Sequence, residues 1–168
     1  MPASSDVVVL IGPMGVGKTT LGKKLAKSLG LVFRDTDAMI VAEHGEISAI
    51  FAEQGEPAFR KLEEAAVAEA LASPAVVATG GGAVLSPANQ AALRNATVFY
   101  LSTDGRHMAS RLAHGNRPLL QNGIEDWRRI YAERRPVYEA CADYEINTST
   151  QSMASALDEI KRKLAGDD

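Results

Sequence analysis

The feature that most constrains this chain is a glycine-rich loop that joins an apolar segment to a helical one. Residues 7–11, Val-Val-Val-Leu-Ile, form a continuous apolar run dominated by β-branched residues, which is typical of a strand covered on both faces. Residues 12–19, Gly-Pro-Met-Gly-Val-Gly-Lys-Thr, match the pattern G-x-x-x-x-G-K-[ST]. Helix-forming residues continue from Lys18 to Leu29, where Gly30 ends them. This succession predicts a P-loop, in which backbone N–H groups turn inward around phosphate oxygens.

The residue types in this loop have defined roles in binding a nucleotide. Lys18 is expected to reach the β- and γ-phosphates, and the hydroxyl of Thr19 is expected to bind Mg²⁺. We therefore predict a nucleotide and Mg²⁺ as ligands. Contacts to the nucleotide are expected from Gly15, Val16, Gly17, Lys18, Thr19 and Thr20.

Several enzyme classes share a P-loop, and the rest of the sequence distinguishes among them. The sequence contains no N-K-x-D, the element with which a GTPase reads guanine. The apolar segment 75–78 runs into Thr79 and three glycines, whereas motor ATPases usually end the corresponding strand on an aspartate. A small-molecule kinase is the class that remains.

The remaining hydrophobic pattern alternates between short strands and helices. Asp37 is expected to cap the helix that follows it, and Pro136 is expected to kink or interrupt a later one. Residues 113–123 have no clear period and are predicted as a loop. Strands separated by helices predict one α/β domain, residues 1–168, built on a parallel sheet. Further strands are predicted at 31–33, 75–78, 97–101 and 144–146, and helices at 37–44, 48–55, 57–72, 87–95, 104–112, 127–141 and 152–164.

The composition argues against several other classes. A single cysteine, Cys141, can form neither an intramolecular disulfide nor a thiolate zinc site. No apolar run approaches the roughly 18 residues that a membrane span needs. The net charge of −3 argues against a nucleic-acid binder, and no cationic segment precedes the first apolar run as in a secretory signal. We expect a cytoplasmic protein with no membrane or nucleic-acid partner.

The arginines are concentrated in one part of the chain. Eight of the eleven lie between Arg94 and Arg135, a stretch that contains no lysine. Arginine is preferred where a planar group must bind phosphate or carboxylate through two parallel hydrogen bonds. A solvated helix face gives the same pattern, and it is the favoured interpretation from the arginines alone.

Two carboxylates, an arginine and three glycines form the candidate acceptor side. Asp35 and Asp37 share a face if their backbone is extended, so that one could order metal-bound water while the other accepts a proton. Helix capping by Asp37, with Asp35 solvated, is an equal alternative. Arg60 is either an anion clamp or a surface partner of Glu64. The triplet Gly80–Gly82 follows a buried strand, which favours backbone contact with a ligand over a plain turn.

Five motifs follow one another along the chain: the P-loop, Asp35-x-Asp37, Phe59-Arg60-x-x-Glu63, Gly80-Gly-Gly82 and Arg117-Pro-Leu-Leu120. In this order they resemble the motifs of the shikimate kinases. The resemblance covers essentially the whole chain and implies a three-layer α/β/α fold with a five-stranded parallel sheet, order 2-3-1-4-5, and a mobile lid at about 112–124. It also implies transfer of the ATP γ-phosphoryl group to the 3-hydroxyl of shikimate, a step toward aromatic amino acids. We expect the enzyme to be a monomer.

The resemblance also assigns roles on the acceptor side. Asp37 would hold the acceptor hydroxyls and serve as the base. Arg60 and Arg134 would bind the carboxylate of shikimate beside Gly80, Gly81 and Gly82. Arg135 adjoins Arg134, so the identity of the second clamp stays open, with the position relative to Pro136 favouring Arg134.

On the nucleotide side, the resemblance assigns Asp35 to Mg²⁺ through a water molecule. Arg117 would reach from the lid to the transferring phosphoryl group, as a catalytic residue alongside Lys18 and Asp37. Arg111 would flank the adenine. Gln151 would contact the adenine from a loop in which some relatives carry a proline.

Two rival functions remain open. Another P-loop metabolite kinase, such as a gluconate or nucleoside-monophosphate kinase, would share the P-loop, and gluconate also carries a carboxylate. A regulatory ATP-binding module would not need the aspartates, glycines and arginines together.

Other prominent side chains are interpreted as structural. Near-helical spacing indicates that the aromatic residues Trp127, Tyr131 and Tyr138 pack in the core, and the histidines lack metal-ligand spacing.

Overall fold

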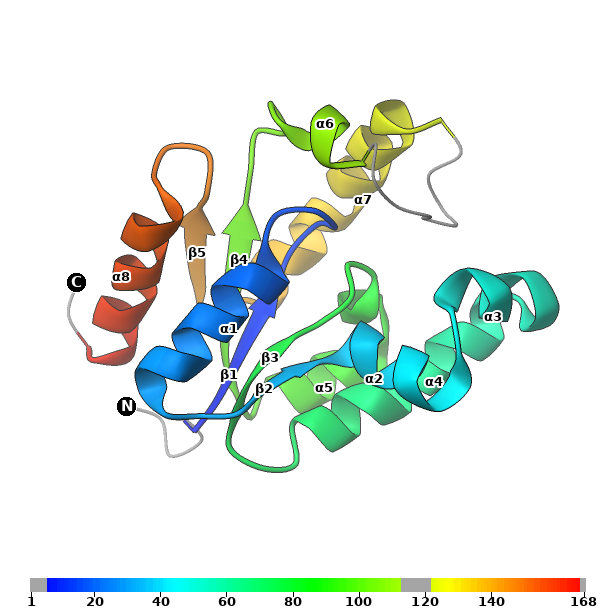
Figure 1. Cartoon of the computed structure of the whole chain (residues 1–168), viewed down its shortest axis with the longest axis horizontal. Coiled ribbons are helices and arrows are strands. Elements are labelled where there is room, and N and C mark those ends of the chain that lie inside the picture. The colour runs from blue at the N-terminus through cyan, green and yellow to red at the C-terminus, as the bar shows by residue number, and fades with distance from the viewer. Residues whose placement is uncertain (1–5, 113–121, 167–168) are drawn as a thin grey trace.

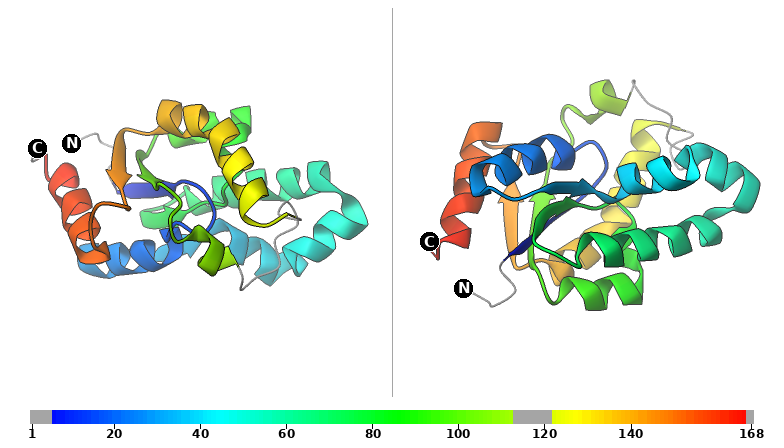
Figure 2. Two further views of the ribbon diagram at one scale, coloured as in Figure 1. Left: turned by 90° about the horizontal axis from the view of Figure 1, so that it is seen from above. Right: turned by 60° about the horizontal axis from the view of Figure 1, so that its bottom comes forward.

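A parallel five-stranded sheet forms the middle layer of the molecule, and helices cover both of its faces (Figure 1, Figure 2). The structure is a computed structural model and describes residues 6–112 and 122–166. The strand order, β2-β3-β1-β4-β5, is the predicted one, and the helices on both faces of the sheet confirm the predicted three layers. The strands are β1 (Val7–Ile11), β2 (Phe33–Asp35), β3 (Ala75–Ala78), β4 (Thr97–Ser102) and β5 (Tyr144–Asn147).

The helices connect these strands in chain order. Between β1 and β2 lies α1 (Lys18–Leu29), and between β2 and β3 lie α2 (Thr36–His44), α3 (Ile47–Gln54) and α4 (Glu56–Ala70). The 3₁₀ turn η1 (Ala83–Leu85) and α5 (Pro87–Leu93) lead to β4. After β4 come α6 (Met108–Leu112) and α7 (Ile124–Cys141), and α8 (Met153–Leu164) follows β5.

The two faces of the sheet bury different side chains, because side chains alternate along a strand. Val8 and Leu10 of β1 pack in a cluster with α1 and α8, to which Leu25 contributes. Val9 and Ile11 pack on the opposite face, in a cluster with α4, α5 and α7. The central strand is therefore covered on both sides, as its continuous apolar run predicts.

A third apolar cluster joins α2, α3 and α4 beyond the β2 edge of the sheet (Figure 1). Its buried members are Ile40, Ile50, Phe59 and Ala66. The cluster fixes the first turns of α4 against α2. Arg60 and Glu63, which lie in these turns, are thereby held beside the start of α2.

The second strand and the helix after it differ from the prediction. The strand is Phe33–Asp35, two residues later than the predicted 31–33, and Val32 is 56% exposed. The N-cap of α2 is Asp35 and not Asp37, since Oδ1 of Asp35 accepts a 3.1 Å hydrogen bond from the Ala38 amide. The backbone turns into a helix at Thr36, so the prediction of an extended segment through Asp37 was wrong.

Two later helices also differ in extent. The helix predicted at 104–112 is only Met108–Leu112, because Asp104 accepts a 2.9 Å hydrogen bond from the Arg106 amide and Gly105 has a φ of 81°. A side chain that bonds to the backbone two residues on forms a turn in place of a helix. Helix α7 begins at Ile124 and continues without interruption past Pro136.

The carboxyl ends of the strands meet at one edge of the sheet. The P-loop follows β1, Asp35 ends β2, the glycine triplet follows β3, and residues 148–152 follow β5. Ligands of open α/β sheets bind at this edge. No helix of the described residues is long and apolar enough to cross a membrane.

Candidate active site

The loop between β1 and α1 has the backbone conformation of a P-loop. Gly12, Gly15 and Gly17 have φ angles of 148°, 83° and 109°, which residues with side chains rarely adopt. A Cβ atom at Gly12 would lie 2.7 Å from the carbonyl oxygen of Leu101. Nζ of Lys18 donates hydrogen bonds to the carbonyl oxygens of Gly12 (2.7 Å) and Pro13 (2.9 Å). Lys18 therefore lies across the loop that it is predicted to serve.

The predicted metal site joins the first turn of α1 to the end of β2. The Thr19 hydroxyl donates a 2.7 Å hydrogen bond to Oδ2 of Asp35. Hydroxyl and carboxylate oxygens are the donors that Mg²⁺ prefers, and it usually retains several water molecules. The two side chains therefore fit the predicted ion, with Thr19 as a direct ligand and Asp35 as a partner of bound water.

A cavity of about 280 Å³ lies between the P-loop, α2 and the glycine triplet. It brings Asp35 and Asp37 together with Lys18, although Asp37 reaches it from a helical turn and not from an extended segment. A Cβ atom at Gly80 would lie 2.7 Å from Oδ1 of Asp37. The full lining is Met14, Gly15, Gly17, Lys18, Thr19, Thr20, Asp35, Asp37, Ala78, Thr79, Gly80 and Gly81.

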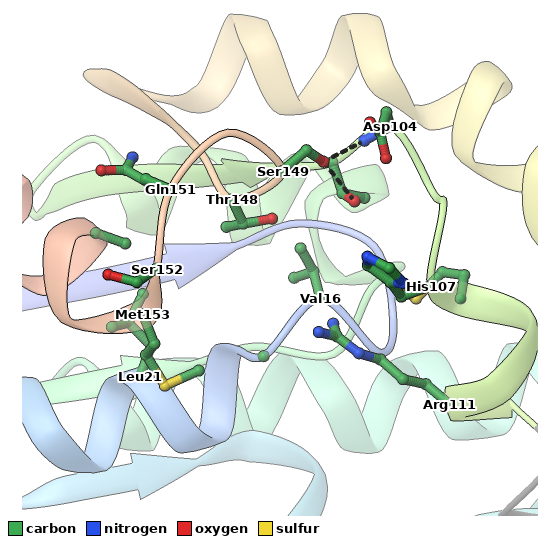
Figure 3. Close-up of a pocket in the computed structure, with 14 residues that line it drawn as sticks. Val16, Leu21, Asp104, His107, Arg111, Thr148, Ser149, Gln151, Ser152 and Met153 are labelled. Carbon is green, nitrogen blue, oxygen red and sulfur yellow. Dashed lines mark hydrogen bonds between the residues drawn. The ribbon is translucent and has the colours of Figure 1, made fainter.

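A second cavity of about 280 Å³ lies on the other side of the P-loop, between the segments that follow β4 and β5 (Figure 3). Val16 and Arg111 line it, and Nη1 of Arg111 donates a 2.7 Å hydrogen bond to the Gly15 carbonyl oxygen. Ser149 holds the β5 loop to the β4 loop, since its Oγ accepts a 2.7 Å hydrogen bond from the Asp104 amide. The cavity has the position expected for a base and ribose beside the phosphate cradle.

Gln151 lines this second cavity, but its side-chain amide is engaged elsewhere. Its Nε2 donates to the Asn147 carbonyl oxygen (2.9 Å) and to Oε1 of Glu159 on α8 (2.8 Å). Its Oε1 accepts a 2.7 Å hydrogen bond from the Ser155 hydroxyl. Figure 3 shows the amide directed away from His107 and Arg111. Gln151 therefore braces the β5 loop against α8.

Arg60 is held by two carboxylates of its own helix. Its Nη1 donates a 2.9 Å hydrogen bond to Glu63, and its Nη2 lies 3.2 Å from an oxygen of Glu56. The alternative prediction, that Arg60 pairs with Glu64 at the surface, is wrong, because Glu64 accepts a hydrogen bond from Ser86. Glu63 is 1% exposed, and this burial raises the pKa of its carboxyl against the opposing effect of the Arg60 charge. A buried glutamate thus orients the candidate clamp.

The glycine triplet gives these side chains room. A Cβ atom at Gly82 would lie 2.6 Å from both Nη atoms of Arg60, and one at Gly81 would lie 3.4 Å from Nη1 of Arg134. Real Cβ atoms essentially never approach other atoms closer than 3.0 Å. Bare backbone of the triplet therefore lies beside both guanidinium groups. This arrangement agrees with a loop that contacts a ligand better than with a plain turn.

The structure distinguishes the two adjacent arginines of α7. Arg134 is 7% exposed and faces the glycine triplet, whereas the side chain of Arg135 is 60% exposed and lies 3.7 Å from Glu139. Tyr138, one helical turn after Arg134, donates a 2.6 Å hydrogen bond to the Gly81 carbonyl oxygen. Arg134 is therefore the one of the two that can act as a clamp.

Some predicted features fall outside the described residues, and some side chains in the site were not predicted to be there. Arg117 and the lid residues 113–121 lie outside the part of the chain that the structure describes. No pattern in the sequence indicated that Glu63 is buried. Its place in the motif Phe59-Arg60-x-x-Glu63 was the one signal that it belongs to the site. Trp127 and Tyr138 are buried as predicted, but both also bond to loops of the site. The described residues contain no group of three or more histidine, cysteine, aspartate or glutamate side chains that could hold a metal ion.

Comparison with known proteins identifies the family. The sequence profile described as shikimate kinase matches residues 14–165. This chain belongs to the shikimate kinase family. It is therefore an ATP-dependent kinase, and ATP with Mg²⁺, the predicted ligands, are those that the family uses.

Two curated shikimate kinases and one solved structure illustrate the relationship. The enzyme of Thiobacillus denitrificans is 46% identical over 89% of this chain and 85% of its own length. The enzyme of Streptomyces coelicolor is 42% identical, over 96% of this chain and 99% of its own length. The shikimate kinase of Acinetobacter baumannii, solved in complex with shikimate, superposes with a TM-score of 0.90 at 36% identity, over 95% of this chain and 93% of that one.

Proposed function

We propose that this chain transfers the γ-phosphoryl group of ATP to the 3-hydroxyl group of shikimate, giving shikimate 3-phosphate and ADP. One observation carries the proposal. A single cavity is lined by Lys18 of the phosphate loop and by Asp37 and Gly80 of the acceptor side. The site therefore has a place for an anionic phosphoryl group directly beside a place for a hydroxyl group.

The acceptor side suits a hydroxylated carboxylic acid. Arg60 and Arg134 approach the glycine triplet from two helices, and two guanidinium groups can bind a carboxylate through parallel hydrogen bonds. The buried carboxylate of Glu63 fixes the direction of Arg60. Asp37 then lies where it can accept a hydrogen bond from a hydroxyl group of shikimate. Gly80 and Gly81 would contact the ring of shikimate.

The nucleotide side suits ATP with its metal ion. The backbone of Gly15, Val16, Gly17 and the start of α1 would surround the phosphates, with Thr20 at the rim. Thr19 would hold Mg²⁺ directly and Asp35 would hold it through water, and the ion would supply positive charge at the transferring phosphoryl group. Arg111 would flank the base, and the braced loop that contains Gln151 would form the opposite wall.

In the proposed reaction, the 3-hydroxyl oxygen of shikimate forms the new bond to the γ-phosphorus as the bond to the ADP oxygen breaks. Asp37 takes the hydroxyl proton. Lys18 moves from the Gly12 and Pro13 carbonyls to the phosphates, and Arg117 of the predicted lid adds a second positive charge. Because phosphoryl transfer has a loose transition state, alignment and charge neutralisation contribute more than base strength.

A gluconate kinase is the rival within the same reaction class, because gluconate is also a hydroxylated carboxylate. The test is ADP release from Mg²⁺-ATP with shikimate, with gluconate, with a nucleoside monophosphate and with no acceptor. We expect ADP release only with shikimate, together with a phosphorus resonance of a 3-phosphate ester. Stimulation by gluconate or by a nucleotide, and not by shikimate, overturns the proposal.

We further propose that the enzyme is a cytoplasmic monomer whose single domain spans residues 1–168. Every side chain assigned above to either substrate comes from one chain, so no partner subunit is needed to complete the site. The test is light scattering at micromolar concentration, for which we expect the mass of one chain, 17.9 kDa. A dimer mass contradicts this part of the proposal.

A further inference from the structure

Helix α7 presents three buried side chains to the two loops of the site. Trp127, Arg134 and Tyr138 are spaced seven and four residues apart, so they lie on one face of the helix. Trp127 contacts the P-loop, whereas Arg134 and Tyr138 contact the glycine triplet. One rigid element therefore touches both loops.

Trp127 holds one peptide of the P-loop. Its indole Nε1 donates a 2.8 Å hydrogen bond to the carbonyl oxygen of Met14, and the side chain is 3% exposed. The ring is fixed from the other side by Gly105, where a Cβ atom would lie 2.9 Å from Cζ3 of Trp127. The ring thus has little freedom to rotate away from the Met14 carbonyl.

The bond to Met14 completes a set of hydrogen bonds to successive P-loop carbonyls. Lys18 donates to the carbonyls of Gly12 and Pro13, and Arg111 donates to that of Gly15. In a planar trans peptide the carbonyl and the next N–H group point in opposite directions. Fixing the Met14 carbonyl on the side of α7 therefore directs the Gly15 N–H group to the opposite side, where a phosphate oxygen would bind.

Tyr138 acts in the same way on the glycine triplet. Its hydroxyl donates a 2.6 Å hydrogen bond to the Gly81 carbonyl, and its ring stacks on Tyr100 with centroids 5.3 Å apart. Burial raises the pKa of Tyr138 to about 12, so its hydroxyl keeps the proton that it donates. The two loops are adjacent, since a Cβ atom at Gly81 would lie 3.5 Å from the Met14 amide nitrogen.

We propose that Trp127 and Tyr138 are positioning residues, one for each substrate. Trp127 sets the Met14–Gly15 peptide for the nucleotide phosphates, and Tyr138 sets the Gly81–Gly82 peptide for the acceptor. Helix α7 thereby fixes the distance between the two substrates. The inference rests on the proposed function for the identity of the acceptor, but the nucleotide half is independent of it.

The test compares three substitutions that keep an aromatic ring. Trp127→Phe removes the indole N–H group, Tyr138→Phe removes the hydroxyl group on Gly81, and Tyr100→Phe is the control. Tyr100 is fully buried in the same cluster, and its hydroxyl bonds to Tyr131 and to neither loop. The measurements are KM for each substrate and the Kd of ADP by calorimetry.

We expect Trp127→Phe to raise the ADP Kd and the ATP KM about 5- to 50-fold with the shikimate KM unchanged within about twofold. Tyr138→Phe should raise the shikimate KM by a similar factor and leave the ADP Kd unchanged. Tyr100→Phe should lower the melting temperature while both KM values stay within about twofold. The inference is overturned if Trp127→Phe or Tyr138→Phe changes the constants for the nucleotide and for shikimate equally. It is also overturned if neither variant changes any of these constants.

A second readout does not depend on any variant folding. Trp127 is the single tryptophan of the chain, so the emission of the wild-type protein comes from this side chain alone. We expect the emission of a buried indole that acrylamide quenches weakly, both without ligand and with saturating ADP. Emission that acrylamide quenches readily in the ligand-free protein overturns the role of Trp127, because the ring would then be free of the Met14 contact. A wild-type enzyme inactive with shikimate would overturn the proposed function instead, and the ADP titrations would still test Trp127.

Discussion

The Thr19 hydroxyl donates a 2.7 Å hydrogen bond to Oδ2 of Asp35, and this contact ties the phosphate loop to the acceptor side of the site. The other oxygen of Asp35 caps α2, the helix that carries Asp37. Asp35 therefore has one observed role, as the cap of α2, and one proposed role, as a partner of water bound to the metal ion.

The first prediction separates these functions with Asp35→Asn. Asparagine caps a helix as well as aspartate, so the free energy of unfolding should stay within about 0.5 kcal/mol of the wild type. The Mg²⁺ concentration for half-maximal rate should rise at least about tenfold, because a partner of metal-bound water loses its charge. Asp35→Ala is the control that also loses the cap, at about 1 kcal/mol. An unchanged Mg²⁺ requirement in Asp35→Asn contradicts the metal assignment.

The second prediction concerns the two adjacent arginines of α7. Arg134→Ala should raise the shikimate KM about 10- to 100-fold and leave the ATP KM nearly unchanged, because it removes charged hydrogen bonds to the carboxylate. Arg135→Ala is the matched control, since that side chain is exposed and forms a 3.7 Å ion pair with Glu139. Initial rates at varied shikimate measure both. Similar KM values in the two variants exclude Arg134 as the clamp.

The third prediction tests the space that the glycine triplet provides. Gly82 has a φ of −99°, which lies outside the left-handed region and is open to alanine, so Gly82→Ala adds little backbone strain. The new Cβ would lie 2.6 Å from both Nη atoms of Arg60 and must displace that guanidinium group. We expect the shikimate KM to rise at least about tenfold with little loss of stability.

The control for this prediction is Gly30→Ala. Gly30 has a φ of 69°, and a Cβ atom there would meet nothing within 4 Å beyond its chain neighbours. Alanine at this position therefore strains the backbone by about 1–2 kcal/mol without touching the site. Its melting temperature should fall while its KM values stay the same. If Gly82→Ala behaves like Gly30→Ala, then the position of Arg60 does not depend on the space at Gly82.

The sequence predicted most of the fold because the pattern of each element is local. The continuous apolar run of β1 and the end of α1 at Gly30 can each be recognised from neighbouring residues. The start of α2 was mistaken because Asp35 and Asp37 are both good caps, and only the pairing of β2 with β3 through Asp35 and Ala78 decides between them. Such a choice depends on residues distant in the sequence.

Parts of the candidate site could not be predicted for the same reason. Nothing near Trp127 in the sequence indicates that its N–H group meets Met14, 113 residues earlier. Glu63 looks like any helical glutamate until the packing of α2 against α4 buries it. Arg134 and Arg135 are alike in sequence and differ only in the face of α7 on which each lies.

The fourth prediction concerns the buried carboxyl group of Glu63. Burial raises its pKa in the folded protein above the usual 4.5, so the unfolded chain loses this proton at a lower pH than the folded one. The contribution of Glu63 to stability is therefore present in full below pH 4.5 and is lost as the pH rises through the folded pKa. Urea unfolding of the wild type and of Glu63→Gln over a pH series measures it.

In that series the wild type should lose stability relative to Glu63→Gln as the pH rises from about 4, and the difference should become constant above the folded pKa. The difference in unfolding free energy between the two proteins removes the contribution of every other titrating group, since both proteins contain those groups. A difference that is independent of pH, or one that grows in favour of the wild type, contradicts the cause assigned to this pKa shift. Glu63→Gln should also raise the shikimate KM, because Arg60 loses its buried charged partner.

The most direct test of the proposed reaction is the rate of shikimate-dependent ADP release by Asp37→Asn. Asparagine keeps the size of the side chain beside Gly80 but cannot accept the hydroxyl proton. We predict that kcat falls at least about 100-fold while the Kd of ADP changes less than about twofold. A variant that retains wild-type turnover would contradict the role of Asp37 as the base in the proposed reaction.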